Sequence, residues 1–143
     1  MSKAWVIVIV VVVCIGIAVG IYWINASEET KESGREVIYD SYLDFQEDMQ
    51  FVGGKLDIGR ASPGDTVKIY DEIYSIEYDQ GNDTTRIRFV SSVSDPKYEW
   101  TYALFDGDLT GQFSVGDKVV VIYHITSKDG NDWIDSKAVE HQQ

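Results

Sequence analysis

The stretch Thr66–Tyr78 reads TVKIYDEIYSIEY, and it decides the fold. Its β-branched and aromatic residues predict a long strand, but the apolar positions change phase within it. Val67 and Ile69 share one parity, whereas Ile76 and Tyr78 share the other. A one-residue phase slip is what a β-bulge produces, and small barrels need bends of that kind. The stretch therefore predicts a bent strand in an all-β domain.

Further strands flank this stretch, and turn signals such as ASPGD, DQGND and KDGND separate them. The other predicted strands are Phe51–Gly59, Thr84–Ser92, Tyr98–Leu104, Lys118–Thr126 and Trp133–Val139. Short strands at this spacing are typical of a barrel or a sandwich, and the small size favours a barrel.

Residues 37–49, ahead of the strands, have a helical period instead. Ile38, Tyr42, Phe45 and Met49 recur at the spacing of one helix face, with acidic residues between them. We expect a short amphipathic helix, either packed on the domain or lying near a membrane.

The N-terminal region contains an uncharged apolar run, WVIVIVVVVCIGIAVGIYWI, at residues 5–24. A helix of this length reaches about 30 Å, the thickness of a bilayer's hydrocarbon core. We expect a transmembrane helix over residues 5–24, between a cytoplasmic N-terminus of residues 1–4 and a polar tether of residues 25–36. A cleaved signal peptide is the alternative, but the run is long for one and lacks a clear small-x-small exit.

The flanks of the run predict its orientation. Lys3 precedes it and Glu28 and Glu29 follow it, so the positive-inside rule places the N-terminus in the cytoplasm. The expected protein is a single-pass protein of the cell membrane with an extracytoplasmic C-terminal domain. Gly16 and Gly20 have the G-x-x-x-G spacing that permits close helix approach, and hence a homodimer through the membrane.

The chain is strongly acidic, with 24 Asp and Glu against 12 Lys and Arg and a net charge of −12. Such a surface repels phosphate backbones and anionic headgroups, which argues against nucleic acid as a partner. It indicates either solubility in a salty environment or a basic partner. The single cysteine, Cys14, lies in the predicted span, so we expect no disulfide in the exported part.

Two segments of the strand region carry a recognisable pattern, FSVGDKVVV at Phe113–Val121 and FVGGKL at Phe51–Leu56. The first resembles the loop-to-strand signature of OB-fold proteins, and the second resembles an OB first strand. The resemblance covers roughly residues 50–141. It implies that residues 50–143 form a small OB-like Greek-key β-barrel, preceded by the single N-terminal transmembrane helix.

The order of parts is also similar to that of the haem chaperone family of cytochrome c maturation. That family has one N-terminal span, an exported OB-type barrel and a haem-bonding histidine just after the last strand. In the segment AVEH, His141 takes that position, so the resemblance implies haem as a cofactor bound through His141. The family's tyrosine beyond the histidine has no counterpart here. A solvated residue in a frayed tail is the alternative for His141.

A loop at residues 106–117 has the oxygen spacing of a calcium site. Asp106, Asp108 and Thr110 occupy positions 1, 3 and 5, Gly111 position 6 and Asp117 position 12. Calcium loops of the EF type use ligands at these positions, although the last is usually Glu. The alternative is an OB connection in which Asp117 belongs to a turn before a strand.

Aromatic residues suggest a ligand face. We expect Tyr98, Trp100 and Tyr102 on one face of a strand, where they would either bind a ligand or rim the core. No nucleophile motif, phosphate loop or Cys/His pair occurs, so we expect no enzyme activity. The sequence therefore predicts a non-catalytic binding or assembly module that engages a protein partner at the membrane, with a haem carrier as the alternative.

Overall fold

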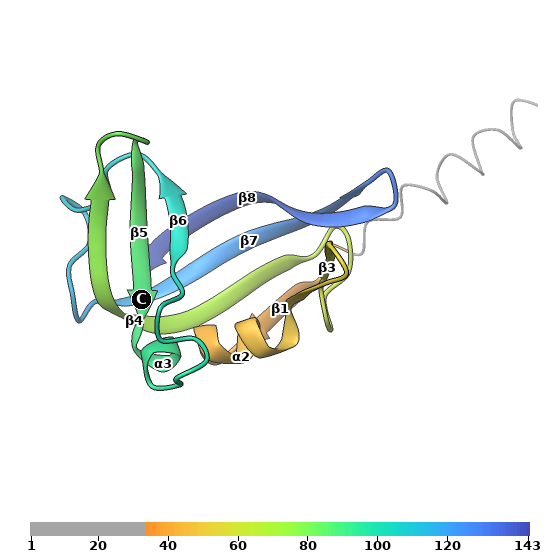
Figure 1. Cartoon of the computed structure of the whole chain (residues 1–143), viewed down its shortest axis with the longest axis horizontal. Coiled ribbons are helices and arrows are strands. Elements are labelled where there is room, and N and C mark those ends of the chain that lie inside the picture. The colour runs from red at the N-terminus through yellow and green to blue at the C-terminus, as the bar shows by residue number, and fades with distance from the viewer. Residues whose placement is uncertain (1–33) are drawn as a thin grey trace, which may run out of the picture. The chain divides into compact units, whose positions relative to one another are not determined.

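The strand β4 (Thr66–Asp79) is the element on which the domain is built in the computed structural model, which describes residues 34–143 (Figure 1). Its first half pairs antiparallel with β7 (Lys118–Lys128), and its second half pairs antiparallel with β5 (Thr84–Phe89). The register with β5 shifts between Ile73 and Ser75, so the predicted bulge is confirmed. The bulge bends β4, which lets one strand serve two parts of the sheet.

The remaining elements extend this sheet or cover it. They are β1 (Glu36–Tyr39), α2 (Tyr42–Asp48), β2 (Gln50–Val52), β3 (Lys55–Asp57), α3 (Val90–Val93), β6 (Ala103–Asp106) and β8 (Asn131–His141). The sheet has the order β6-β5-β4-β7-β8, and β1 pairs in parallel with β4. Strands dominate the described residues, which confirms the all-β class.

The core lies between the bent sheet and α2. Alternate residues of β4 such as Val67 and Ile69 are fully buried, and so is Val121 of β7. Tyr42 and Phe45 of α2 close the core from the other side. Each large side chain buried in this way stabilises the fold by about 1.5–3 kcal/mol.

The predicted helix of residues 37–49 is shorter than expected. Helix α2 begins only at Tyr42, because Ser41 caps it by accepting a hydrogen bond from the Asp44 amide at 3.1 Å. Ile38 lies in strand β1 and is half exposed, so it was wrongly assigned to the helix. The rest of the predicted face, including Met49, is buried against the domain.

Two predicted strands also need correction. The Phe51–Gly59 segment is a hairpin of β2 and β3, because Gly53 and Gly54 take positive φ values of 58° and 79° and reverse the chain. The predicted strand Thr84–Ser92 ends at Phe89, and helix α3 follows.

The membrane span of residues 5–24, the N-terminus of residues 1–4, the Gly16 and Gly20 contact and most of the tether lie outside the described residues. Of the predicted tether, Glu36 already belongs to β1. Within residues 34–143, no helix is long and apolar enough to cross a membrane.

Candidate functional site

The outward face of β5 carries two arginines. Ile87 and Phe89 point into the core and are buried, so the alternation of the strand turns Arg86 and Arg88 outward. Leu104 of β6 lies opposite Arg86 in the antiparallel register. Two positive charges therefore stand on an exposed sheet face of an otherwise acidic domain.

Exposed aromatic rings surround these arginines. Tyr74 comes from the bulge of β4, whereas Trp100 and Tyr102 come from the turns that precede β6. Trp100 is 76% exposed, and the two tyrosines are about half exposed. We name this set the aromatic–arginine face; it comprises Tyr74, Arg86, Arg88, Trp100, Tyr102 and Leu104.

Cation–π contacts hold the rings in place. The guanidinium carbon of Arg88 lies 5.4 Å from the ring centre of Tyr74 and 5.3 Å from that of Trp100. The guanidinium carbon of Arg86 lies 5.3 Å from the ring centre of Tyr102. At exposed sites such contacts are worth about 0.5–1 kcal/mol each. The rings are therefore exposed but already positioned.

The arginines are only partly satisfied within the domain. Arg86 forms an ion pair with Asp79 at 3.1 Å, and Arg88 donates a hydrogen bond to the carbonyl oxygen of Glu99. The Asn82 side chain, two backbone amides and Arg86 together lower the pKa of Asp79, so this carboxylate stays charged. Within residues 34–143, the Nε atoms of Arg86 and Arg88 are buried and have no hydrogen-bond partner.

The predicted ligand face is only partly assembled. Tyr98 is buried. Tyr98 and Trp100 lie in turns and Tyr102 in the irregular stretch directly before β6, so the expectation that the three share a strand face is wrong. Trp100 and Tyr102 do lie together with Arg86 and Arg88, which the sequence-based set omitted. The alternation of Arg86 and Arg88 with buried residues was the signal that could have revealed them.

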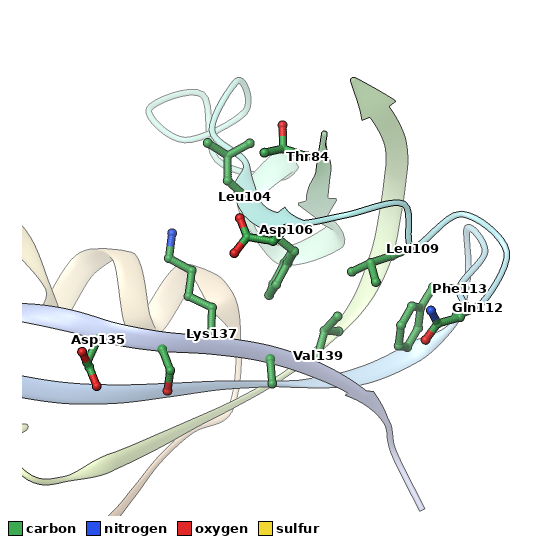
Figure 2. A pocket seen from close by; sticks show the side chains of 12 residues that line it. Thr84, Leu104, Asp106, Leu109, Gln112, Phe113, Asp135, Lys137 and Val139 are labelled. Atoms are coloured by element: carbon green, nitrogen blue, oxygen red, sulfur yellow. The ribbon is translucent and has the colours of Figure 1, made fainter. Parts of the chain in front are cut away.

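A cleft of about 650 Å³ lies between β6 and β8, the two edge strands of the sheet order (Figure 2). Figure 2 shows Lys137 extending from β8 towards the β6 side, where Asp106 lies. The residues that line the cleft are Thr84, Leu104, Phe105, Asp106, Leu109, Gln112, Phe113, Asp135, Ser136, Lys137, Ala138 and Val139. Leu104 thus belongs both to the cleft and to the aromatic–arginine face.

His141 is the last residue of β8 and packs on the domain. Its ring stacks on Phe113 with ring centres 4.6 Å apart, and its Nε2 atom lies 3.0 Å from the carbonyl oxygen of Gln112. Its Nδ1 atom lies 3.9 Å from a carboxylate oxygen of Asp117. The tail is not frayed, because β8 runs to His141 and Gln142 continues its hydrogen bonding to β7. The alternative of a solvated residue holds in part, since the His141 side chain is 56% exposed.

The residues of the predicted calcium loop form separate local contacts. Asp108 accepts hydrogen bonds from the hydroxyl and the amide of Thr110, which lower the pKa of Asp108. Asp117 accepts a hydrogen bond from the Ser114 amide at 2.9 Å, whereas Asp106 ends β6. Across residues 34–143, no three His, Cys, Asp or Glu side chains are grouped as a metal site requires.

Comparison of the chain with protein-family models, curated proteins and solved structures finds no significant match. The class of protein therefore has to be argued from the sheet and its surface.

Proposed function

We propose that the chain is a single-span membrane protein whose extracytoplasmic domain is an OB-like β-barrel that binds a protein partner. The binding surface is the aromatic–arginine face, and the role is non-catalytic. The anchor rests on the uncharged run of residues 5–24 and on the charges that flank it.

The strand order supports the OB-like barrel. A long bent strand that is shared by two antiparallel ladders is a feature by which small barrels turn back on themselves. β4 has this form, and the order β6-β5-β4-β7-β8 brings β6 and β8 to the two sides of one cleft. In this proposal, the cleft is the seam of a partly open barrel.

The exposure of Trp100 beside Arg88 carries the proposal. Tryptophan, tyrosine and arginine are enriched in the energetic centres of protein interfaces, because large rigid rings bury much area at little entropic cost. On this face the rings are held by cation–π contacts before any partner arrives. Because the rings are already positioned, less side-chain conformational entropy is lost when a partner binds.

The charges of the face define the chemistry of the partner. Arg86 and Arg88 are cations on an acidic domain, and guanidinium groups bind carboxylates in a bidentate manner. The expected contact surface of the partner therefore combines apolar side chains with at least one carboxylate. The acidic remainder of the domain disfavours a nucleic acid in this place.

Recovery of the partner from detergent-solubilised native membranes, with the tagged full chain as bait, tests the proposal. Wild type is compared with Trp100→Ala and Arg88→Ala. Truncation of an interface hot spot costs about 2 kcal/mol or more, which is about thirtyfold in Kd. We expect a stoichiometric partner with wild type and its loss with both variants.

The matched control is Trp133→Ala, which removes a half-exposed tryptophan from a different part of the surface. We expect it to retain the partner. Equal recovery by Trp100→Ala, or no stoichiometric partner with wild type, contradicts the proposal.

One observation favours the haem alternative, namely that His141 stacks on Phe113, which lines the largely apolar end of the cleft. A flat hydrophobic cofactor would fit such a lining, with Leu109 and Phe113 against its ring and His141 as the bonding residue. His141 would first have to leave the carbonyl oxygen of Gln112.

Haem titration of the full chain in detergent, followed by absorbance, decides this alternative. We compare wild type, His141→Ala and His124→Ala, the last removing an exposed histidine of β7. Binding that depends on His141 alone supports a haem carrier. Absence of binding, or equal binding by His141→Ala, excludes it.

A further inference from the structure

Two hairpins that carry exposed apolar side chains lie at one end of the domain (Figure 1). Phe51 is 80% exposed, Val52 is 62% exposed, and Trp133 of β8 is about half exposed. Figure 1 shows the β2–β3 hairpin and the β7–β8 turn at the same end, and β3 packs against β8. We name this surface the hairpin end; it comprises Phe51, Val52, Lys55, Lys128 and Trp133.

The N-terminal segment enters the domain at this same end. The Arg35 amide donates to a carboxylate oxygen of Asp65, and the Arg35 guanidinium pairs with Asp65 at 3.0 Å. The backbone carbonyl oxygen of Asp65 accepts a hydrogen bond from the amide of Ile125, which pairs with Ile134 of β8. Ile134 is adjacent to Trp133 in β8. The Arg35–Asp65 pair, where the chain enters the domain, is therefore separated from the exposed tryptophan by the single strand β7.

The chain between the predicted span and Arg35 is short. Residues 25–34 reach about 35 Å at most when fully extended, and less in any other conformation. The lipid surface that holds the predicted anchor is therefore the apolar environment nearest to the hairpin end.

The side chains of the hairpin end suit a lipid interface. Tryptophan prefers the level of the headgroups, phenylalanine is typical of the apolar face of elements that lie in the interface, and lysines beside them extend towards phosphate groups. Lys55 and Lys128 flank the apolar residues, but Asp57 and Asp129 are adjacent to them or nearby in the hairpins. Asp132, directly before Trp133, adds a third carboxylate, so the local charge is slightly negative and a zwitterionic lipid suits this end better than an anionic one.

We propose that the hairpin end rests on the membrane that carries the chain's own anchor, with Phe51, Val52 and Trp133 inserted at the headgroup level. This inference rests on the anchor in the proposed function. It also gives that function an orientation. Figure 1 places β5 and β6 at the opposite end of the domain, so the aromatic–arginine face is held away from the lipid.

Spin labels on the full chain in phosphatidylcholine vesicles test the proposal. In a Cys14→Ser background, Val52→Cys is compared with Val115→Cys, whose native valine is 65% exposed in the loop between β6 and β7. We expect the label at residue 52 to lose collisions with a water-soluble nickel reagent and to keep those with oxygen. The label at residue 115 should keep both.

The native Cys14, labelled in the wild-type chain, reports the anchor separately. If its label lies deep in the bilayer while residues 52 and 115 are equally accessible to nickel, the hairpin end does not touch lipid and the inference is overturned. If the Cys14 label is itself accessible to nickel, the anchor fails, and the inference fails with it. Protection of residue 52 from both reagents that grows with the protein-to-lipid ratio indicates a second copy instead of lipid, and also overturns it.

Tryptophan quenching by brominated phosphatidylcholine gives a second measurement. In a chain with Trp5 and Trp23 replaced by Phe, further variants retain either Trp133 or Trp100 alone. We expect the brominated lipid to reduce the fluorescence of Trp133 and to leave that of Trp100 unchanged. Equal quenching of both overturns the inference.

Discussion

The hydroxyl groups of Tyr42 and Tyr123 meet inside the core, 2.8 Å apart. The Tyr42 ring also stacks on Phe89, with ring centres 4.5 Å apart. Burial raises the pKa of Tyr42 to about 12 and raises the pKa of Tyr123 well above its ordinary value. Both tyrosines are therefore neutral in the folded domain at pH values where they would ionise in an unfolded chain.

This pair makes the domain sensitive to alkali. An unfolded tyrosine ionises near pH 10, so the contribution of the pair is fully present below about pH 10 and is lost as the pH rises towards the folded pKa values. We expect the free energy of unfolding to fall from about pH 10 upwards. Urea unfolding of the detergent-solubilised chain, followed by near-UV circular dichroism at stepped pH, measures this slope. Tyr42→Phe/Tyr123→Phe should reduce the slope, whereas Tyr74→Phe, at an exposed site, should not. Part of the slope should remain, because burial and the hydrogen bond to Asp48 also raise the pKa of Tyr39 to about 12. An unchanged slope in the double variant contradicts the assignment.

Gly59 is required by its surroundings as well as by its backbone. Its φ is +54°, and a Cβ atom there would lie 2.4 Å from the side chain of Asp48. Asp48 accepts hydrogen bonds from the Tyr39 hydroxyl at 2.6 Å and from the Arg60 amide at 3.0 Å. Burial works against the charge of Asp48, but these bonds and the charge of Arg60 outweigh it, so the pKa of Asp48 is lowered.

We expect Gly59→Ala to destabilise the domain by about 2 kcal/mol or more, because the strained backbone and the displaced carboxylate both contribute. Gly53→Ala is the control, since Gly53 has a similar φ of +58° but open space around it. It should cost only the backbone strain, about 1 kcal/mol. Thermal unfolding of both variants measures the difference. Equal destabilisation by the two substitutions would show that the Asp48 side chain moves aside at no cost in free energy.

At the scale of elements, a partly buried carboxylate joins α2 to the sheet. Asp71 of β4 accepts hydrogen bonds from the Tyr42 amide at 2.9 Å and from the Ser91 hydroxyl. Ser91 in turn accepts a hydrogen bond from the Leu43 amide at 3.0 Å. The first turn of α2, whose amides have no partners within the helix, is thereby bonded to both β4 and α3.

We expect Asp71→Ala to cost about 1.5–3 kcal/mol, the range for hydrogen bonds to a charged group. Asp44→Ala is the control, because Asp44 is exposed in the same turn of α2 and should cost at most about 1 kcal/mol. Urea titration with far- and near-UV detection measures both. A loss in Asp71→Ala no larger than that in Asp44→Ala would refute this role.

Local patterns in the sequence predicted the elements that local chemistry determines. The phase slip in Thr66–Tyr78 predicted the bulge, and DQGND predicted the turn between β4 and β5. The strand β1 was missed because it pairs in parallel with β4, a contact that no local pattern records. The alternation from Tyr98 to Leu104 was misleading, because successive i to i+3 hydrogen bonds wind the chain there.

The candidate site was predictable only in part for the same reason. Trp100 and Tyr102 were identified by residue type, whereas Arg86 and Arg88 become part of the face only when the turns before β6 fold over β5. Tyr98 has the same chemistry but is buried, which residue type alone does not reveal.

At the scale of the whole molecule, Asp65 determines where the N-terminal segment joins the domain. Its side chain is fully buried and accepts hydrogen bonds from Arg35 and from the Ser62 amide at 2.8 Å. The Arg35 side chain is 58% exposed, so Asp65→Ala leaves no buried charge behind, and its cost is that of the lost hydrogen bonds to a charged group, about 1.5–3 kcal/mol. We expect a loss of this size for Asp65→Ala, against less than about 0.5 kcal/mol for the exposed Asp135→Ala. Chemical unfolding of the full chain in detergent measures both, and similar values would show that the pair is dispensable.

The exposed edge of β8 also affects how readily the protein associates with itself. β8 is an edge strand that is exposed along most of its length, and unpaired backbone groups on such an edge are a template for pairing with another copy. Asp132, Asp135 and Glu140 outnumber Lys137 along it, so two copies brought edge to edge repel each other. The range of this repulsion shrinks from about 8 Å at 0.15 M salt to about 3 Å at 1 M. The acidity of the chain thus protects an open sheet edge from self-association, and this protection weakens as the ionic strength rises.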